Sequence, residues 1–211
     1  MIVGFVGFIG SGKGTAGDIL CEKYGFVKES FAKPVKDIAS VMFGWDRKLL
    51  EGDTKESREW REQKDGMWSE LLGKDFSPRL ALQLIGTEVG RNVFHPDLWI
   101  KMMESRLTLS TKDYVITDVR FPNEMRFIHE MGGKVIEIQR GNNPEWYGTA
   151  AVANIEVKES IAIPCIREMK EKYKIHESEW KWIGSLFIDT VIKNDEGIEE
   201  LERNIKNYLT L

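Results

Sequence analysis

An apolar run at the beginning of the chain leads directly into a glycine-rich loop, and no other segment constrains the fold as strongly. Residues 2–6 have the composition of a buried strand, and the loop after them reads Gly-Phe-Ile-Gly-Ser-Gly-Lys-Gly-Thr over residues 7–15. Glycines let the backbone curl until several N–H groups point inward, and a helix that begins at the end of the loop adds the positive end of its dipole. The pattern of strand, loop, Lys13 and helix predicts a phosphate-binding loop in an α/β protein.

The loop predicts a site for the phosphates of a nucleoside triphosphate, with Lys13 as the cation that meets the β- and γ-phosphates. The residues expected to bind these phosphates alongside it are Gly10, Ser11, Gly12, Gly14 and Thr15. Gly14 stands where the strict GxxxxGK[ST] pattern has a hydroxyl, so Thr15 comes one position late and is the weaker candidate for a magnesium ligand. The alternative is a glycine-rich turn without a ligand, which the agreement of strand, spacing, lysine and helix disfavours.

The composition excludes several classes of protein. The chain has 211 residues, of which 42% are hydrophobic and 30% charged, and its net charge is −4. No basic excess points to a nucleic acid or a membrane surface as a partner. Cys21 and Cys165 lie far apart and lack the spacing of a zinc site. The absence of a signal peptide and of an apolar run of roughly 18 residues predicts a cytoplasmic protein.

Strand-like and helix-like runs alternate along the chain, which predicts an α/β fold with a mainly parallel five-stranded sheet between helical layers. Strands are expected at residues 2–6, 27–31, 113–118, 134–139 and 187–192. Helices are expected at residues 13–24, 34–43, 54–71, 78–94, 96–107, 121–131 and 197–209. Residues 1–211 are interpreted as a single domain with a helical insertion at about 34–95 and, because no strand period is found there, a lid-like excursion at about 141–183.

Residues that follow the predicted strands are candidates for chemistry, because ligands of open α/β sheets bind beyond the carboxyl ends of the strands. Strand 113–118 ends in Asp118, a position from which a carboxylate can reach a magnesium ion, directly or through a water. A turn-forming aspartate is the alternative. Arg120 is expected to contact an anion, and Arg140, after strand 134–139, is interpreted either as an ATP contact or as a solvent-facing charge.

The helical insertion carries further candidates for binding an acceptor molecule. Lys36 lies in the first turn of a helix and could meet an acceptor phosphate, although a plain capped helix also fits. Arg58 belongs to a charged run that is either a solvated helix face or, with Arg61 on the same face, a phosphate clamp. A third group recurs in four-residue steps and predicts a wall for a nucleotide: Arg79, Gln83, Thr87 and Arg91, with Gly86 allowing close approach.

Histidines and tryptophans give weaker indications. His95 is expected to make a hydrogen bond within a turn, His129 to lie on the surface, and His176 to cap a helix or to touch a nucleotide. Some of four tryptophans that lie among charged or turn-forming residues are expected to stack on a base: Trp45, Trp60, Trp68 and Trp146.

Taken in order, motifs over nearly the whole chain resemble the deoxynucleoside monophosphate kinases of tailed phages. The segments that carry the resemblance, besides the adenylate-kinase-like loop, are Pro34–Asp37, Arg79–Glu88, Trp99–Lys101, Thr117–Glu124 and Val191–Asp195. The resemblance implies a three-layer P-loop kinase fold and transfer of a phosphoryl group from ATP to a deoxynucleoside monophosphate. It further implies a magnesium ion, in many members a homodimer, and the host cytoplasm if a phage encodes the chain.

The resemblance also implies roles for particular residues. Those expected to be catalytic are Lys13, Arg79, Asp118 and Arg120, and those expected to bind the acceptor are Lys36, Arg58, Arg79, Gly86, Thr87, Trp99 and Glu124. The chain departs from the best-known member in two places: the loop has Gly-Thr after Lys13 where that member has an acidic residue and threonines, and the acceptor-binding segment is shorter. The base specificity could therefore differ. Another small-molecule P-loop kinase, such as a dephospho-coenzyme-A kinase, and a non-enzymatic nucleotide switch are the alternatives.

Overall fold

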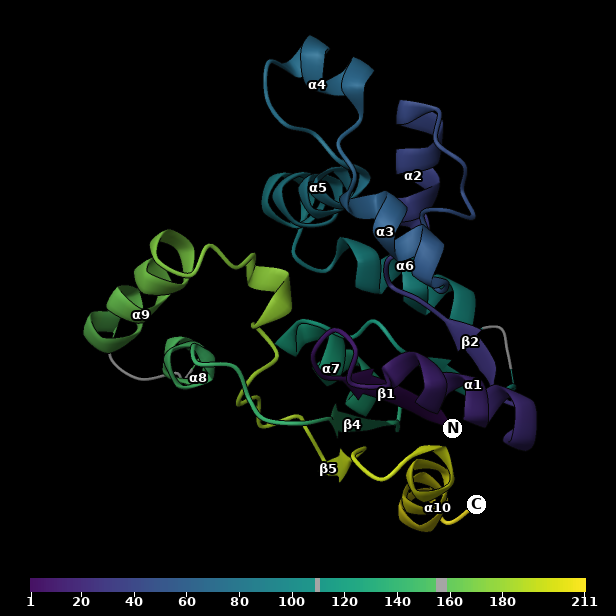
Figure 1. Ribbon diagram of the computed structural model, residues 1–211. Helices are drawn as coiled ribbons and strands as arrows, with labels where there is room; N and C mark the ends of the chain where they lie inside the picture. Colours follow the sequence, from purple (N-terminus) through teal and green to yellow (C-terminus); the bar gives the residue numbers. More distant parts are fainter. Residues whose placement is uncertain (109–110, 155–158) are drawn as a thin grey trace. The chain divides into compact units, whose positions relative to one another are not determined.

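A parallel sheet forms the framework of the protein. The computed structural model describes residues 1–108, 111–154 and 159–211. Within these residues one five-stranded sheet has the order β2-β3-β1-β4-β5, and every neighbouring pair of strands is parallel (Figure 1). The strands are β1 (Ile2–Val6), β2 (Val27–Glu29), β3 (Tyr114–Ile116), β4 (Lys134–Gln139) and β5 (Thr190–Lys193). The predicted fold class is therefore confirmed.

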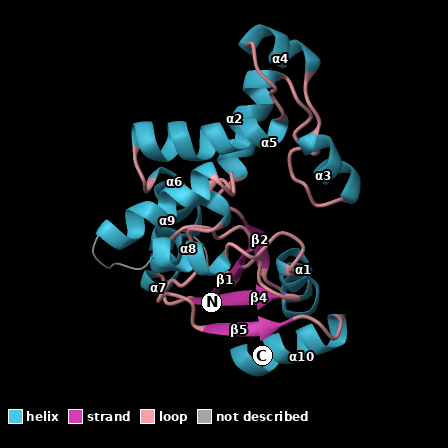
Figure 2. Ribbon diagram, turned by 60° about the vertical axis from the view of Figure 1, so that its left-hand side comes forward, coloured by secondary structure: helices cyan, strands magenta, loops and turns pink. Residues whose placement is uncertain are grey.

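Helices occupy most of the chain between the strands (Figure 2). The α-helices are α1 (Lys13–Tyr24), α2 (Lys33–Phe43), α3 (Lys55–Glu62), α4 (Gly66–Leu72), α5 (Pro78–Gln83), α6 (Leu98–Leu107), α7 (Pro122–Glu130), α8 (Tyr147–Asn154), α9 (Glu159–Glu171) and α10 (Ile198–Leu209). A π-helical stretch, η1 (Leu84–Phe94), continues α5, and a short 3-10 helix, η2 (Glu177–Glu179), follows α9. No helix of the described ranges is long and apolar enough to cross a membrane.

The two faces of the sheet are covered by different helices. Side chains of successive strand residues point to opposite faces, and in β1 the fully buried Val3 and Phe5 belong to a core formed with α1 and α10. Gly4 faces the other way, where a Cβ atom would lie 2.5 Å from Ile128 Cδ1 of α7. The sheet thus lies between a layer containing α1 and α10 and a layer containing α7.

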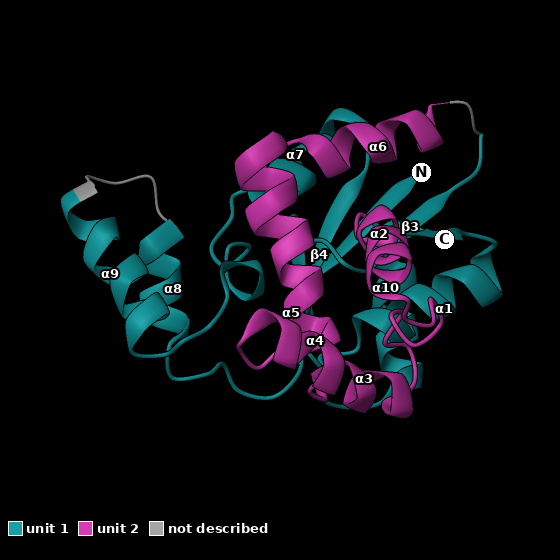
Figure 3. Ribbon diagram, turned by 90° about the horizontal axis from the view of Figure 1, so that it is seen from above, with its two compact units in different colours: residues 1–30, 110–211 teal, residues 31–109 magenta. Residues whose placement is uncertain are grey.

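The chain divides into two compact units (Figure 3). The first comprises residues 1–30 and 110–211 and contains the sheet, and the second comprises residues 31–109 and is helical. The buried core of the second unit consists of Val35, Ala39, Trp45, Leu50, Phe76, Ala81, Ile85 and Trp99. Trp60 and Trp68 pack against this core. Because Trp45 is buried there, the expectation that it is available for base stacking is wrong.

The predicted helix at 54–71 is in fact two helices. Thr54 caps α3 through the backbone N–H of Ser57, and Asp65 caps α4 by accepting from the N–H of Trp68 at 3.0 Å. A side-chain cap provides for N–H groups at a helix start, so a second cap after α3 favours a new helix over a continued one. Conversely, α8 and α9 occupy much of the excursion at 141–183, where none of the helix ranges predicted from the sequence falls.

Gly90 is a point of close packing within the second unit and provides a test of the fold. A Cβ atom there would lie 2.3 Å from Trp99 Cζ2 and 2.8 Å from the Ile85 carbonyl oxygen, whereas one at Gly86 would meet only Val35, at 3.7 Å. We expect Gly90→Ala to lower the free energy of unfolding by roughly 1–3 kcal/mol, as overpacking does. Gly86→Ala, the control on the same helical stretch, should cost nothing or stabilise slightly. Equal effects of the two substitutions in urea denaturation would contradict this packing.

Candidate active site

The glycine-rich loop joins β1 to α1 and is held in shape by a residue from the far end of the chain. Asn194, directly after β5, donates from its Nδ2 atom to the Ser11 carbonyl oxygen at 2.8 Å. Gly12 has a φ of 104°, and a Cβ atom there would lie 2.2 Å from the same Nδ2 atom. Only glycine tolerates both this backbone conformation and this close approach. Asn194 belongs to a segment singled out by the resemblance, yet it was not predicted to be a site residue.

Lys13 lies at the start of α1 and folds back over the loop. Its Nζ atom donates to the carbonyl oxygens of Gly7 and Phe8, each at 2.7 Å. Burial, together with the positive charge of Arg120, lowers the pKa of Lys13 from 10.5 to about 8, although the negative charge of Glu179 acts in the opposite direction. The lysine is thus a cation at neutral pH that lacks much of its hydration, and phosphate oxygens would supply the missing negative charge.

The other loop residues predicted to bind phosphate lie around Lys13. Gly10 is exposed with a φ of 80°, and Gly14 and Thr15 lie exposed in the first turn of α1. Ser11 is buried, and its hydroxyl oxygen has no hydrogen-bond partner among the described residues. A buried polar atom without a partner costs free energy. A ligand with acceptor oxygens, bound in the loop, would give this hydroxyl a hydrogen-bond partner and remove that cost.

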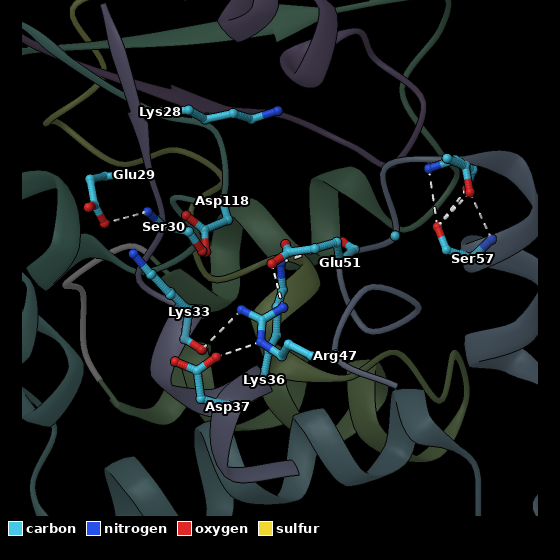
Figure 4. Close-up of polar contacts among 12 residues, drawn as sticks. Lys28, Glu29, Ser30, Lys33, Lys36, Asp37, Arg47, Glu51, Ser57 and Asp118 are labelled. Carbon is cyan, nitrogen blue, oxygen red and sulfur yellow. Dashed lines mark hydrogen bonds and ion pairs between the residues drawn. The ribbon is translucent and has the colours of Figure 1, made fainter. Parts of the chain in front are cut away.

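Asp118 follows β3, at the carboxyl edge of the sheet as predicted, and Ser30 after β2 donates its hydroxyl to Asp118 Oδ2 at 2.7 Å (Figure 4). Nowhere in the described ranges do three acidic, histidine or cysteine side chains gather into a metal site. Magnesium usually binds through one or two carboxylates together with waters and substrate phosphates. For that kind of shared coordination Asp118 stays the predicted carboxylate, with the exposed hydroxyl of Thr15 as the weaker candidate.

Arg120 is fixed at both ends by carboxylates. The backbone N–H of Arg120 donates to Glu124 Oε2 at 2.7 Å, and its NH1 atom donates to Glu179 Oε1 at 2.5 Å. Burial would lower the pKa of Arg120, but Glu179, Asp118 and Glu124 together raise it. Glu124, predicted to bind the acceptor, is itself buried at the start of α7. Its carboxylate shapes the backbone that carries Arg120, and Glu179 was not predicted at all.

Arg140 is exposed at the end of β4. The sequence left two interpretations of this residue open, an ATP contact or a solvent-facing charge. Arg140 makes no hydrogen bond or ion pair with another described residue. Its role as an ATP contact stays a prediction.

The residues predicted to form a wall for a nucleotide lie on α5 and η1 of the second unit. The Arg79 side chain is 21% exposed, and its Nε atom lies 3.4 Å from Glu62 Oε1. Thr87 is buried, and the Gly86 carbonyl oxygen accepts from the indole N–H of Trp99 at 2.7 Å. Trp99 itself is only 4% exposed. In this conformation, therefore, Trp99 supports the wall through Gly86 from the inside, and its predicted contact with an acceptor stays untested.

Lys36 and Arg58 make polar contacts within the second unit. Lys36 forms an ion pair with Glu51, which also pairs with Arg47, and Arg47 Nε donates to Asp37 at 2.5 Å (Figure 4). Although burial alone would raise it, the pKa of Glu51 lies below its usual range, because Lys36 and Arg47 both stabilise the charged form. Arg58 is exposed and donates to the carbonyl oxygen of Asp53 at 2.8 Å. An acceptor phosphate at Lys36 would have to compete with Glu51.

The three histidines have local structural roles. The Nδ1 atom of His95 accepts from the backbone N–H of Asp97 at 3.1 Å, which confirms the predicted turn contact. His176 caps η2 by accepting from the N–H of Ser178, one of its two predicted roles. His129 lies at the surface of α7 as predicted, with its side chain 32% exposed and its Nε2 atom 2.9 Å from Asp189 Oδ2.

The excursion at 141–183 contacts the glycine-rich loop through an aromatic cluster. The Phe8 ring lies 5.0 Å from that of Trp182 and 5.5 Å from that of Trp146, in edge-to-face geometry. Trp146, one of the tryptophans considered for base stacking, thus packs on the loop. Closure of this excursion over a nucleotide stays a prediction.

Three comparisons place the chain among known proteins. The model of the deoxynucleotide monophosphate kinase family matches residues 52–150. A putative deoxynucleotide monophosphate kinase of Acanthamoeba polyphaga mimivirus is 32% identical over 152 residues, which cover 66% of this chain and 74% of the relative. The deoxynucleoside-5'-monophosphate kinase of Escherichia phage T5 is 28% identical over 184 residues, covering 62% of this chain and 72% of the relative.

Among solved structures, a dephospho-CoA kinase from Campylobacter jejuni has a TM-score of 0.43 and 18% identity, covering 99% of this chain and 95% of that chain. These values are too low to bear on substrate or mechanism.

The buried charge of Lys13 leads to a prediction about stability. Because its pKa in the folded protein lies below the ordinary value, the unfolded chain holds this proton more tightly, and the native protein gains stability as the pH rises from about 8 towards 10.5. Below pH 8 the wild type carries the full cost of the buried charge. We expect Lys13→Met to be at least as stable as the wild type at pH 7, with an advantage that shrinks between pH 8 and 10. A constant loss of melting temperature at every pH would contradict the cost of this charge.

Proposed function

The chain belongs to the deoxynucleotide monophosphate kinase family, and we propose that it transfers the γ-phosphate of ATP to a deoxynucleoside monophosphate, giving the diphosphate. The observation that carries the proposal for this chain's own residues is the cationic pair formed by Lys13 and Arg120 beside a glycine-rich loop. Phosphoryl transfer needs little covalent chemistry from a protein, because positioning and neutralisation of charge account for most of the catalysis.

The donor half of the proposal rests on the first unit. The loop amides and Lys13 would hold the β- and γ-phosphates, and Lys13 would exchange the carbonyl oxygens of Gly7 and Phe8 for phosphate oxygens. Arg120 would meet the charge that develops on the transferred group. Arg140, which is exposed after β4, would add a further contact to ATP.

A magnesium ion, when bound, would bridge phosphate oxygens and neutralise part of their charge. Asp118 is the residue proposed to hold it, directly or through a water, and Thr15 is the weaker candidate. Ser30 would orient the carboxylate of Asp118 through its hydroxyl.

The acceptor half of the proposal rests on residues of the second unit. Arg79, Gly86 and Thr87 lie on α5 and η1, and we propose that they bind the monophosphate, with Trp99 supporting Gly86 from within the core. Lys36 and Arg58 would bind the acceptor phosphate after exchanging their present partners. No general base is needed, because a monophosphate is already a nucleophile at neutral pH.

A screen of acceptors tests the proposal. Release of ADP from ATP would be followed with each common deoxynucleoside and ribonucleoside monophosphate, with dephospho-coenzyme A, and without an acceptor. We expect turnover with at least one deoxynucleoside monophosphate and little without an acceptor. Turnover with dephospho-coenzyme A alone would assign a different kinase, and slow hydrolysis that ignores every acceptor would indicate a nucleotide switch.

Removal of the loop cation should abolish transfer. We expect Lys13→Ala to lower kcat/KM at least about 100-fold, since loss of a preorganised charge in a transition state typically costs on the order of 3 kcal/mol. The matched control is Lys28→Ala, which removes an exposed lysine paired with Asp18 in the same unit. A folded Lys13→Ala protein with more than a tenth of the wild-type rate would refute the assignment.

The acceptor assignment is tested by Arg79→Ala. We expect this change to weaken binding or turnover of the monophosphate about 10-fold or more while leaving the affinity for ATP nearly unchanged, because charged hydrogen bonds to phosphate are strong. Arg203→Ala, at an exposed position on α10, serves as the control. The affinities would be measured by titration calorimetry with each nucleotide separately, and equal losses for ATP and monophosphate would rule out an acceptor-specific role.

A further inference from the structure

Glu179 lies outside the residues matched by the family model, yet its carboxylate pairs with Arg120, one of the predicted catalytic residues. It belongs to η2, after the excursion, and forms an ion pair with Arg120 at 2.5 Å. We propose that Glu179 is a positioning residue, which anchors one nitrogen of the Arg120 guanidinium so that its remaining edge is presented to a phosphoryl oxygen. The inference rests on the proposed function, because it takes Arg120 to be a phosphate contact.

The contacts of Arg120 are concentrated on a single nitrogen atom. NH1 donates to Glu179 Oε1 and also lies 3.1 Å from the carbonyl oxygen and 3.4 Å from the hydroxyl oxygen of Ser178. The Nε and NH2 atoms have no hydrogen-bond partner among the residues that the structure describes. The Arg120 side chain is 36% exposed, compared with 18% for Glu179. The arginine is therefore held at its inner nitrogen and accessible elsewhere.

The edge that carries Nε and NH2 has the geometry for binding an anion. These two N–H donors can meet two oxygens of a phosphate in the paired arrangement that makes arginine contacts strong and directional. If Glu179 occupied that edge, it would compete with the ligand. Because it occupies NH1 instead, the carboxylate and a phosphate can bind the same guanidinium at the same time.

Glu179 can act as an anchor because its own backbone is fixed. The Glu179 carbonyl oxygen accepts from the indole N–H of Trp182 at 3.0 Å, and Trp182 is 2% exposed. The neighbouring Trp180 is 3% exposed, and its carbonyl oxygen accepts from Asn154 Nδ2 at 2.8 Å. At the other end, His176 caps η2. A short turn held by two buried indoles thus presents the carboxylate in one place.

The backbone and the side chain of Arg120 are each held by a glutamate, and the two glutamates belong to different helices. Glu124 of α7 binds the backbone N–H of Arg120, and Glu179 binds the tip of its side chain. A free arginine has many rotamers, and ordering it during the reaction costs free energy. Fixing it in advance removes that cost, and a displacement of about 1 Å in a catalytic group can slow a reaction roughly 100-fold.

The experiment is a double-mutant cycle on Glu179 and Arg120. Glu179→Gln removes the charge and keeps the shape, and Glu177→Gln, on the same short helix, is the matched control. We expect Glu179→Gln to lower kcat about 10- to 100-fold with KM for ATP changed less than about threefold, because a loose arginine still attracts phosphate but is no longer aligned in the transition state. In an Arg120→Ala background the same change should alter kcat less than about twofold.

The outcomes separate this inference from the proposed function. A kcat for Glu179→Gln within twofold of the wild type, with Arg120→Ala strongly impaired, would overturn the anchor and leave the proposed function intact. Faster turnover or tighter ATP binding in Glu179→Gln would also overturn it, since the carboxylate would then be a competitor of phosphate. An active Arg120→Ala protein would refute the contact on which the inference rests. If Glu179→Gln does not fold, the cycle is run with Glu179→Asp, which keeps the charge on a shorter side chain. This change should lower kcat in the protein that has Arg120 and leave kcat nearly unchanged in the Arg120→Ala background.

Discussion

The position of the Lys13 charge is the constraint on which the rest of the site depends. A lysine at the start of a helix, against the helix dipole and largely out of water, is unfavourable, and its pKa falls to about 8. The protein keeps the charge at neutral pH by giving the ammonium group two backbone carbonyl oxygens of the loop. These carbonyl oxygens can be replaced by a ligand that carries more negative charge. A polyphosphate brings more negative charge than two carbonyl groups, so the same constraint that costs stability favours binding.

The surrounding elements keep the remaining charges in place. The loop is braced by Asn194, which follows β5, Asp118 is oriented by Ser30, which follows β2, and Arg120 is held by Glu179. The first two contacts join the ends of separate strands at the carboxyl edge of one parallel sheet, where α/β proteins bind ligands, and the third links such an end to η2. Among the proposed phosphate contacts, Arg120 would therefore need little rearrangement before a reaction, and such preorganised charge is the form of catalysis that phosphoryl transfer requires.

Local sequence patterns predicted much of this arrangement. The loop, Lys13, the five strands and the strand-end residues Asp118 and Arg120 could be found because each depends on a short motif or on the alternation of strands and helices. The break between α3 and α4 was missed because the charged run at 51–62 and the residues after the break both have helix-like sequences. The cap at Asp65 becomes informative only when the partner N–H is known.

Contacts between distant segments could not be predicted from the sequence. Glu179 meets Arg120 across 59 positions of the chain, and Asn194 meets Ser11 across 183. No spacing rule connects such residues, because their proximity follows from the order of the strands in the sheet. Trp45 shows the reverse problem, since a tryptophan among polar residues was a candidate for stacking on a base, yet it is buried in the core of the second unit.

Transfer of an isotopic label tests the central claim most directly. ATP labelled in its γ-phosphate would be incubated with the protein and the acceptor that gives the fastest turnover, and the products separated by chromatography. The account predicts that the label appears in the deoxynucleoside diphosphate, in an amount equal to the ADP formed. Label released as inorganic phosphate, with the monophosphate unchanged, would contradict it.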